Sequence, residues 1–363
     1  MNASFFRVSY AAAWIVLLVF ILNYFLEILP WNGIILILFW ILLGFGVRSK
    51  ETLKGYTYTI MIFASVTAAM FYPNWFTIWG EFTLSTLIVP LLQLIMFGMG
   101  TSMSIRDFQG VIKMPKGVLA GVLCQFTIMP FIGFALAKGS GLPPEIAAGI
   151  ILVGCSPSGM ASNVMSFLAK ANLALSITIT AVTTMLAPFV TPALMGWLAG
   201  EFVEVDILKM MMDIIKIVII PIGAGLLFNR FFSGKIKWLD DAMPLLSMIA
   251  IGVIIVIITA AGRDSLLSIG PLLIGLVVIH NLSGYTLGYW VGKLFRMDER
   301  DCRTIALEVG MQNGGLASGI AKEMGKIATV GLAPAVFGPF MNITGSMLAS
   351  YWHRKGVKGE DSD

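Results

Sequence analysis

Two stretches of the chain decide its fold: residues 149–170, GIILVGCSPSGMASNVMSFLAK, and residues 304–326, TIALEVGMQNGGLASGIAKEMGK. In each of them an apolar helical run is interrupted by glycine, proline or amide residues and then resumes. A shift of 156 residues aligns Gly154 with Gly310, Gly159 with Gly315, Ala161 with Ala317, and Ser162 with Ser318. Irregular backbone at membrane depth is tolerated only inside protein or around a cavity, so both stretches predict a discontinuous helix beside a binding site.

The composition places the whole chain in a membrane. Hydrophobic residues make up 58% of its 363 residues and charged residues only 12%, which is about half the charged share of a soluble domain. These figures exclude a soluble enzyme, a nucleic-acid-binding protein and a disordered tail. A polytopic membrane protein remains.

Twelve apolar segments are long enough to cross the roughly 30 Å hydrocarbon core. They lie at residues 8–29, 31–47, 56–73, 82–101, 115–138, 144–169, 173–199, 206–229, 241–262, 270–294, 301–323 and 327–351. The first has no small-residue cleavage site after it, so we interpret it as a retained helix and not as a signal peptide. Loops after even-numbered segments and the two termini hold 18 of the 24 lysines and arginines, which predicts that both termini are cytoplasmic.

The two interrupted segments are the sixth and the eleventh. Because they are five segments apart, and five is odd, the related halves run through the membrane in opposite directions, as in inverted-repeat secondary transporters. We therefore predict an all-α polytopic membrane protein with an inverted five-helix repeat and two discontinuous crossing helices. The predicted divisions are two extra N-terminal transmembrane helices (1–50), a first repeat (51–200), a second, inverted repeat (201–351) and a cytoplasmic tail (352–363).

Glu308 lies in the middle of the second interrupted segment, where an ionised carboxylate costs at least ~2.5 kcal/mol. Residues with oxygen-bearing side chains accompany it: Gln312, Asn313, Ser162, Asn163, Ser176 and Thr180. Hard oxygen donors with a single negative charge suit an alkali cation. The competing interpretation is a neutral or paired structural glutamate.

Catalytic chemistry is not favoured. The three cysteines, Cys124, Cys155 and Cys302, have no CxxC spacing and are expected to be free, buried thiols. An intramembrane protease would need a Ser–His pair or paired aspartates at mid-depth, and Ser156 and Ser158 would both depend on His280. We expect His280 to be a buried histidine that packs between helices. A channel is disfavoured because one carboxylate at a helix crossing indicates a binding site and not a lined pore.

Three motifs resemble the signatures of the bile acid:sodium symporter family: GCSPSGMASN at 154–163, LALSITIT at 173–180 and EVGMQNGGLA at 308–317. Their order and separation match, and the resemblance covers about residues 56–351. It implies a panel domain, a core domain and two broken helices that cross near two sodium ions. By resemblance, the first ion is held by Ser162, Asn163, Ser176, Thr180 and Glu308, and the second by Gln125, Glu308, Gln312 and the backbone carbonyls of Val309 and Met311.

The substrate region departs from the family pattern. Many members have PGGTASN where this chain has PSGMASN, and Trp-His-Asn where this chain has Phe340, Met341 and Asn342. Met160 and Met341 either fill gaps or make the pocket more apolar, which would favour a bulkier organic anion. The expected substrate-binding residues are Gly159, Met160, Asn313, Met341 and Asn342.

The predicted function is that of a sodium-coupled symporter, with two Na⁺ as coupling ions, that imports an organic anion such as a bile acid or a small carboxylate by alternating access. The alternative is a proton-coupled carrier, or an exporter of anions, with the same broad fold. The expected partners are the small organic anion and membrane lipids, with no nucleic acid and no obligate protein partner. The expected location is the plasma membrane, which is the inner membrane in a Gram-negative cell.

Overall fold

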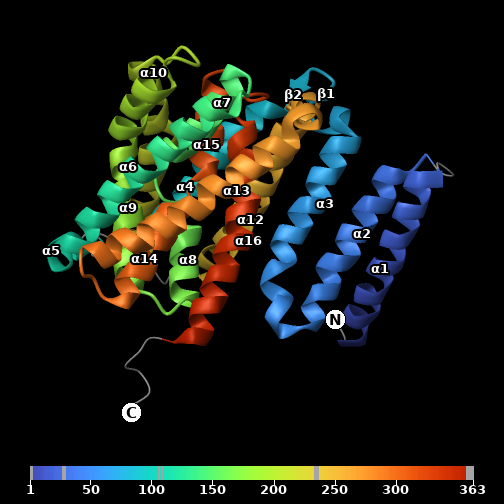
Figure 1. Cartoon of the computed structure of the whole chain (residues 1–363), viewed down its shortest axis with the longest axis horizontal. Coiled ribbons are helices and arrows are strands. Elements are labelled where there is room, and N and C mark those ends of the chain that lie inside the picture. Colours follow the sequence, from blue (N-terminus) through green and yellow to red (C-terminus); the bar gives the residue numbers. More distant parts are fainter. Residues whose placement is uncertain (1–2, 27–29, 105–106, 108, 233–236, 357–363) are drawn as a thin grey trace.

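The computed structural model of the protein describes residues 3–26, 30–104, 107, 109–232 and 237–356. Most of these residues are helical (Figure 1). The α-helices are α1 (Ala3–Leu26), α2 (Asn32–Gly46), α3 (Thr57–Phe71), α4 (Ile88–Ser102), α5 (Gly110–Lys113), α6 (Pro115–Ser140), α7 (Pro144–Cys155), α8 (Ala161–Leu168), α9 (Leu173–Leu194), α10 (Ile207–Ile214), α11 (Ile220–Phe232), α12 (Lys237–Ala261), α13 (Arg263–Leu294), α14 (Glu299–Gly310), α15 (Gly314–Glu323) and α16 (Leu332–Lys355). The strands are β1 (Ile78–Trp79) and β2 (Phe82–Thr83).

The prediction of an all-α polytopic membrane protein is confirmed. Within the described residues, nine helices are long and apolar enough to cross a membrane. The other three predicted segments correspond to the shorter apolar helix α3 and to the broken pairs α7/α8 and α14/α15. The inverted relation of the two halves stays a prediction.

Several predicted boundaries differ from the structure by a few residues; α13, for example, begins at Arg263 and not at residue 270. The fourth segment was expected to be helical from residue 82, but Phe82 and Thr83 form β2, which pairs with β1 in a short antiparallel hairpin. Gly80, between the strands, has a φ of +61°, a conformation that suits a tight hairpin turn and interrupts a helix. At the other end, α16 runs four residues into the predicted tail, to Lys355, and residues 357–363 of that tail lie outside the described residues.

The helices divide into two packed groups and one hairpin. Helices α6 to α9 and α13 to α16 contact one another and form what we call the core group. Helices α3, α4, α11 and α12 form the panel group, and α10 links it to α9. The predicted extra helices α1 and α2 form a hairpin that packs on α3 through α2, at the edge of the molecule (Figure 1).

Both broken helices stop for local reasons. Helix α7 ends at Cys155 because Pro157 restricts Ser156 to an extended backbone (φ −76°, ψ 154°). Helix α14 ends at Gly310, and Met311 is likewise extended. Helix α15 then starts at Gly314, and the side chain of the preceding Asn313 accepts a hydrogen bond from the Leu316 N–H, the usual role of an N-cap residue.

The two breaks contact each other at the centre of the core group. The Gly159 N–H donates to the Met311 carbonyl (2.8 Å), and the Asn313 N–H donates to the Pro157 carbonyl (2.9 Å). These bonds satisfy backbone groups that the helices leave free, as membrane depth requires. A Cβ on Gly159 would lie 2.7 Å from the Gln312 carbonyl oxygen, so only glycine allows the chains to approach this closely.

Candidate functional site

Glu308, in the last turn of α14, is fully buried. Its Oε1 accepts hydrogen bonds from the hydroxyls of Ser162 and Ser176, both at 2.5 Å. Its Oε2 accepts one from the hydroxyl of Thr180 at 2.8 Å. Ser162 is on α8, and the other two are on α9, so three helices meet at this carboxylate.

Asn163 completes this cluster. Its Oδ1 lies 2.8 Å from Ser176 Oγ and 3.2 Å from Thr180 Oγ1, so it is an alternative acceptor for the single hydrogen of each hydroxyl. The structure therefore brings together all five residues predicted for the first ion. A serine or threonine hydroxyl that donates its hydrogen keeps lone pairs, so each of these oxygens can also coordinate a cation. The donor set is one carboxylate and neutral oxygens, which fits an alkali cation.

The residues predicted for the second ion also lie together, around the break that follows α14. The side-chain Nε2 of Gln125, from α6, donates to Gln312 Oε1 (2.7 Å) and to the Ser156 carbonyl (2.8 Å). Gln312 Nε2 donates to the Val309 carbonyl (2.6 Å). The Met311 carbonyl is bound by Gly159, as described above. All are buried.

Ser158 was not among the predicted ion ligands, although its hydroxyl lies close to one of them, Gln125. Its hydroxyl is 3.1 Å from the Glu308 carbonyl oxygen and 3.3 Å from Gln125 Oε1. The one signal for it was the resemblance, which implies a glycine where this chain has Ser158. Its direction toward Gln125, which is 33 residues away, depends on the fold.

A cavity of about 410 Å³ lies between the two breaks and the panel group. All five predicted substrate residues line it: Gly159, Met160, Asn313, Met341 and Asn342. Three further methionines face them from the panel group, Met96 on α4 and Met243 and Met248 on α12. The remaining lining is mostly isoleucine, glycine and serine, and no charged side chain is among the described residues that line the cavity.

His280 and the three cysteines, which were expected to have no functional role, lie in packed interior surroundings. His280 is fully buried, its Nε2 lies 2.9 Å from the Met129 carbonyl oxygen, and its ring meets Phe337 edge-on. The prediction that it packs between helices is confirmed. Cys124, Cys155 and Cys302 are free and buried, as expected.

Arg303 is a structural residue that sequence reasoning missed, since it was assigned no role beyond its charge. Its side chain is 1% exposed, and its guanidinium donates to the carbonyls of Ala169 (3.1 Å), Trp352 (3.2 Å) and Gly356 (2.6 Å). These carbonyls lie at the C-terminal ends of α8 and α16, where a cation is favourable. Arg303 thus ties the end of one broken helix to α14, which begins the other.

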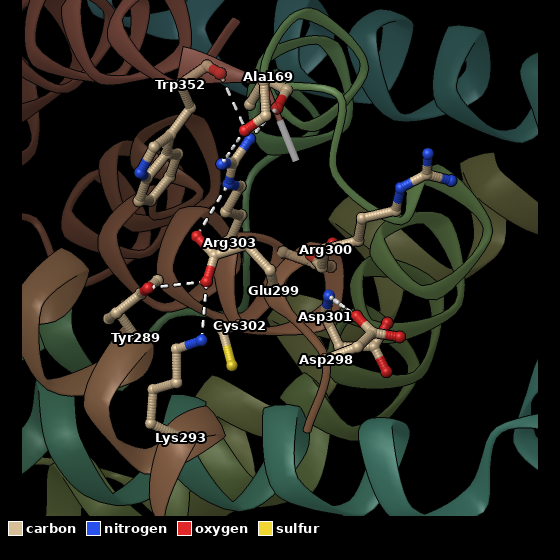
Figure 2. A network of polar contacts seen from close by, with 12 residues as sticks. Ala169, Tyr289, Lys293, Asp298, Glu299, Arg300, Asp301, Cys302, Arg303 and Trp352 are labelled. Atoms are coloured by element: carbon tan, nitrogen blue, oxygen red, sulfur yellow. Dashed lines mark hydrogen bonds and ion pairs between the residues drawn. The ribbon is translucent and has the colours of Figure 1, made fainter. Parts of the chain in front are cut away.

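Glu299 balances the charge of Arg303 (Figure 2). Its Oε1 is 3.1 Å from Arg303 Nε, and its Oε2 accepts hydrogen bonds from Lys293 (2.7 Å) and Tyr289 (2.8 Å). The i,i+4 spacing of Glu299 and Arg303 is the one signal in the sequence that could have indicated this pair. The carbonyl partners have no such signal.

Comparisons with known proteins agree with this architecture. The family model for the sodium bile acid symporter family matches residues 89–269. The uncharacterized sodium-dependent transporter YocS of Bacillus subtilis (strain 168) is 40% identical over 313 residues, which cover 86% of this chain and 95% of that protein. Two chloroplastic proteins of Arabidopsis thaliana are also similar: the probable sodium/metabolite cotransporter BASS1 (33% identity, 79% of this chain, 68% of that one) and BASS5 (34%, 84% and 77%).

These relatives are named as transporters and not as enzymes, in agreement with the sequence-based prediction. Their similarity extends over most of this chain and is not confined to one motif. The similarity of YocS, at 40% identity over nearly its whole length, is decisive. The chain belongs to the sodium bile acid symporter family.

Proposed function

We propose that this protein is a symporter that uses two sodium ions to import an organic anion by alternating access. The observation that supports this proposal most directly is the buried Glu308 carboxylate, which meets three hydroxyls from α8 and α9 beside a cavity. The names of the similar proteins, sodium-dependent transporter and sodium/metabolite cotransporter, point to the same coupling ion.

Sodium would act by joining elements that otherwise share only a few polar contacts. A first ion between Glu308, Ser162 and the α9 hydroxyls neutralises the carboxylate and draws together both broken helices. A second ion adds Gln125 of α6 to the same unit. Gly159 and Asn313, which line the cavity, are neighbours of these oxygens in the chain. Ion binding would therefore set the geometry of the residues that meet the substrate.

The cavity supports an anion with an apolar body, such as a bile acid, more than a small carboxylate. Its volume of about 410 Å³ falls in the usual range for organic ligands, and methionines adapt to irregular apolar surfaces. The anionic group would meet the N-terminal end of α8, which has no side-chain cap and whose N–H groups and dipole favour negative charge. Asn313 and Asn342 add polar contacts at the same cavity.

The proposed setting is the plasma membrane, or the inner membrane of a Gram-negative cell, with both termini in the cytoplasm. The uneven distribution of lysine and arginine among the loops supports this orientation. We propose that the core and panel groups together are built from an inverted five-helix repeat.

The direct test is uptake into proteoliposomes under an inward sodium gradient, with choline as the replacement ion. We expect uptake of a bile acid or another apolar organic anion in sodium, and loss of nearly all of it in choline. Small carboxylates should be compared as substrates in the same assay. Uptake that persists in choline and follows an imposed pH gradient would contradict sodium coupling and would support the proton-coupled alternative.

In alternating access, the cavity is closed to one side of the membrane and must open to that side during transport. Here the core and panel groups pack tightly against each other at one end of the cavity. The cavity lies along the second half of α4, whereas the first half of α4 packs against α15. Leu92 is fully buried there, and a Cβ on Gly319 would lie 2.4 Å from its Cδ1. Beyond this contact, Lys322 Nζ donates to Ser85 Oγ (3.0 Å). We propose that these contacts close the outer side and separate during transport.

Cross-linking tests this proposal. In the double variant Ser85→Cys/Lys322→Cys, a bifunctional thiol reagent should arrest uptake, and a cleavable reagent should restore uptake on reduction. The native cysteines are buried, so background reaction should be small. Each single variant serves as a control and should keep transporting after treatment. Full transport by the cross-linked double variant would show that this contact does not open.

A further inference from the structure

The break between α7 and α8 contains a hydroxyl that the expected ion sites leave unassigned, that of Ser158. Ser158 is fully buried, and its backbone pairs with Gln312 in an isolated antiparallel bridge. The backbone is held on both sides of this bridge by the hydrogen bonds of the crossing. The crossing itself therefore sets the direction of the Ser158 side chain.

That direction is toward Gln125, an expected ligand of the second ion, and toward the backbone carbonyl of Glu308. Ser158 Oγ lies 3.1 Å from the Glu308 carbonyl oxygen and 3.3 Å from Gln125 Oε1. A hydroxyl has one hydrogen and two lone pairs, so it can donate to one of these oxygens and still direct a lone pair toward a cation bound beside Gln125. Serine oxygen is also a hard, neutral donor, like the amide and carbonyl oxygens around it.

We propose that Ser158 determines the strength of sodium binding, because its Oγ is an additional ligand of the second ion. The inference rests on the proposed sodium coupling and adds a ligand to it. A glycine at this position would supply no oxygen, so the second site of this protein binds sodium more tightly than the same site built with glycine. Ser158 also contacts Glu308, whose carboxylate serves the first ion, and thereby connects the two sites.

The test is a sodium titration of thermal stability, with purified protein in detergent and potassium chloride added to keep the ionic strength constant. We expect Ser158→Gly and Ser158→Ala to raise the sodium concentration for half-maximal stabilisation about tenfold, the change expected for one lost contact to a charged group. The titration should also become less steep, because the second ion no longer binds over the range of sodium concentrations in which the first ion stabilises the protein.

Ser156→Ala is the matched control. Ser156 lies in the same break and is equally buried, but its hydroxyl donates to the Leu152 carbonyl within α7 (2.8 Å). Its sodium titration should match that of the unaltered protein. If Ser158→Gly is unstable even in potassium chloride, Ser158→Ala, which retains the Cβ, decides the question.

The outcomes separate this inference from the proposed function. If sodium stabilises the unaltered protein and both Ser158 variants at the same concentration, the role of Ser158 is wrong and sodium coupling stands. If sodium fails to stabilise the unaltered protein, both proposals are overturned. A shift in the Ser158 variants with none in Ser156→Ala supports Ser158 as a ligand.

Discussion

Glu308→Gln is expected to abolish sodium-dependent uptake and to weaken sodium binding about 100-fold or more, the scale associated with removing one partner of a buried ion pair. Glutamine keeps the size of the side chain and an oxygen acceptor, but it cannot neutralise the charge of an ion held between α8, α9 and α14. The folded protein should remain in the membrane, because the hydroxyls around Glu308 can still bond to an amide. Stabilisation by sodium chloride relative to potassium chloride is the measurement, together with uptake.

The stability assay should detect the loss of sodium binding in Glu308→Gln easily, because the expected stabilisation by bound sodium is large. A ligand at 100 times its dissociation constant stabilises a protein by about 2.7 kcal/mol, and this gain should disappear in Glu308→Gln. Glu323→Gln is the control, because Glu323 is a half-buried glutamate near the end of α15, away from the oxygens of the candidate ion sites. Normal sodium stabilisation of Glu308→Gln would show that this carboxylate does not bind the coupling ion.

Arg303→Ala is expected to lower the free energy of unfolding by about 3 kcal/mol or more, as found when one partner of a buried ion pair is removed. The carbonyls of Ala169, Trp352 and Gly356 would lose their charged donor, and Glu299 would lose its buried partner. Arg303→Lys should recover only part of the loss, because an ammonium group cannot reproduce the planar fork of guanidinium donors. Thermal unfolding in potassium chloride measures the effect without any contribution from sodium.

Lys293→Ala provides the contrast on the same carboxylate. Lys293 also binds Glu299, but its side chain is 38% exposed, whereas that of Arg303 is 1% exposed. Because an exposed ion pair contributes only about 0 to 1 kcal/mol, Lys293→Ala should change the free energy of unfolding much less than Arg303→Ala. Equal decreases in the free energy of unfolding would mean that Arg303 stabilises the protein through its ion pair with Glu299 and not through its hydrogen bonds to the helix ends.

The features that the sequence predicted correctly are set by residues close together in the chain. The apolar segments are read from composition, and the two breaks from Pro157 and from the glycines and amides around Gln312. Glu308 was identified because a carboxylate is costly at membrane depth, and ionisable residues that are kept there usually have a functional role. Its oxygen partners were found because hydroxyl and amide residues are rare in such segments and because the motifs resemble those of a known family.

The sequence alone therefore determined the class of the protein, the positions of its spanning segments and breaks, and the residues of the candidate ion sites. The tertiary structure decided which side chains meet across those breaks. Ser158 contacts Gln125, Arg303 binds the carbonyl of Ala169, and Leu92 closes over Gly319 only after distant helices have packed. The physical reason is that composition and periodicity report what each segment buries, whereas a contact between segments depends on the packing of the whole fold.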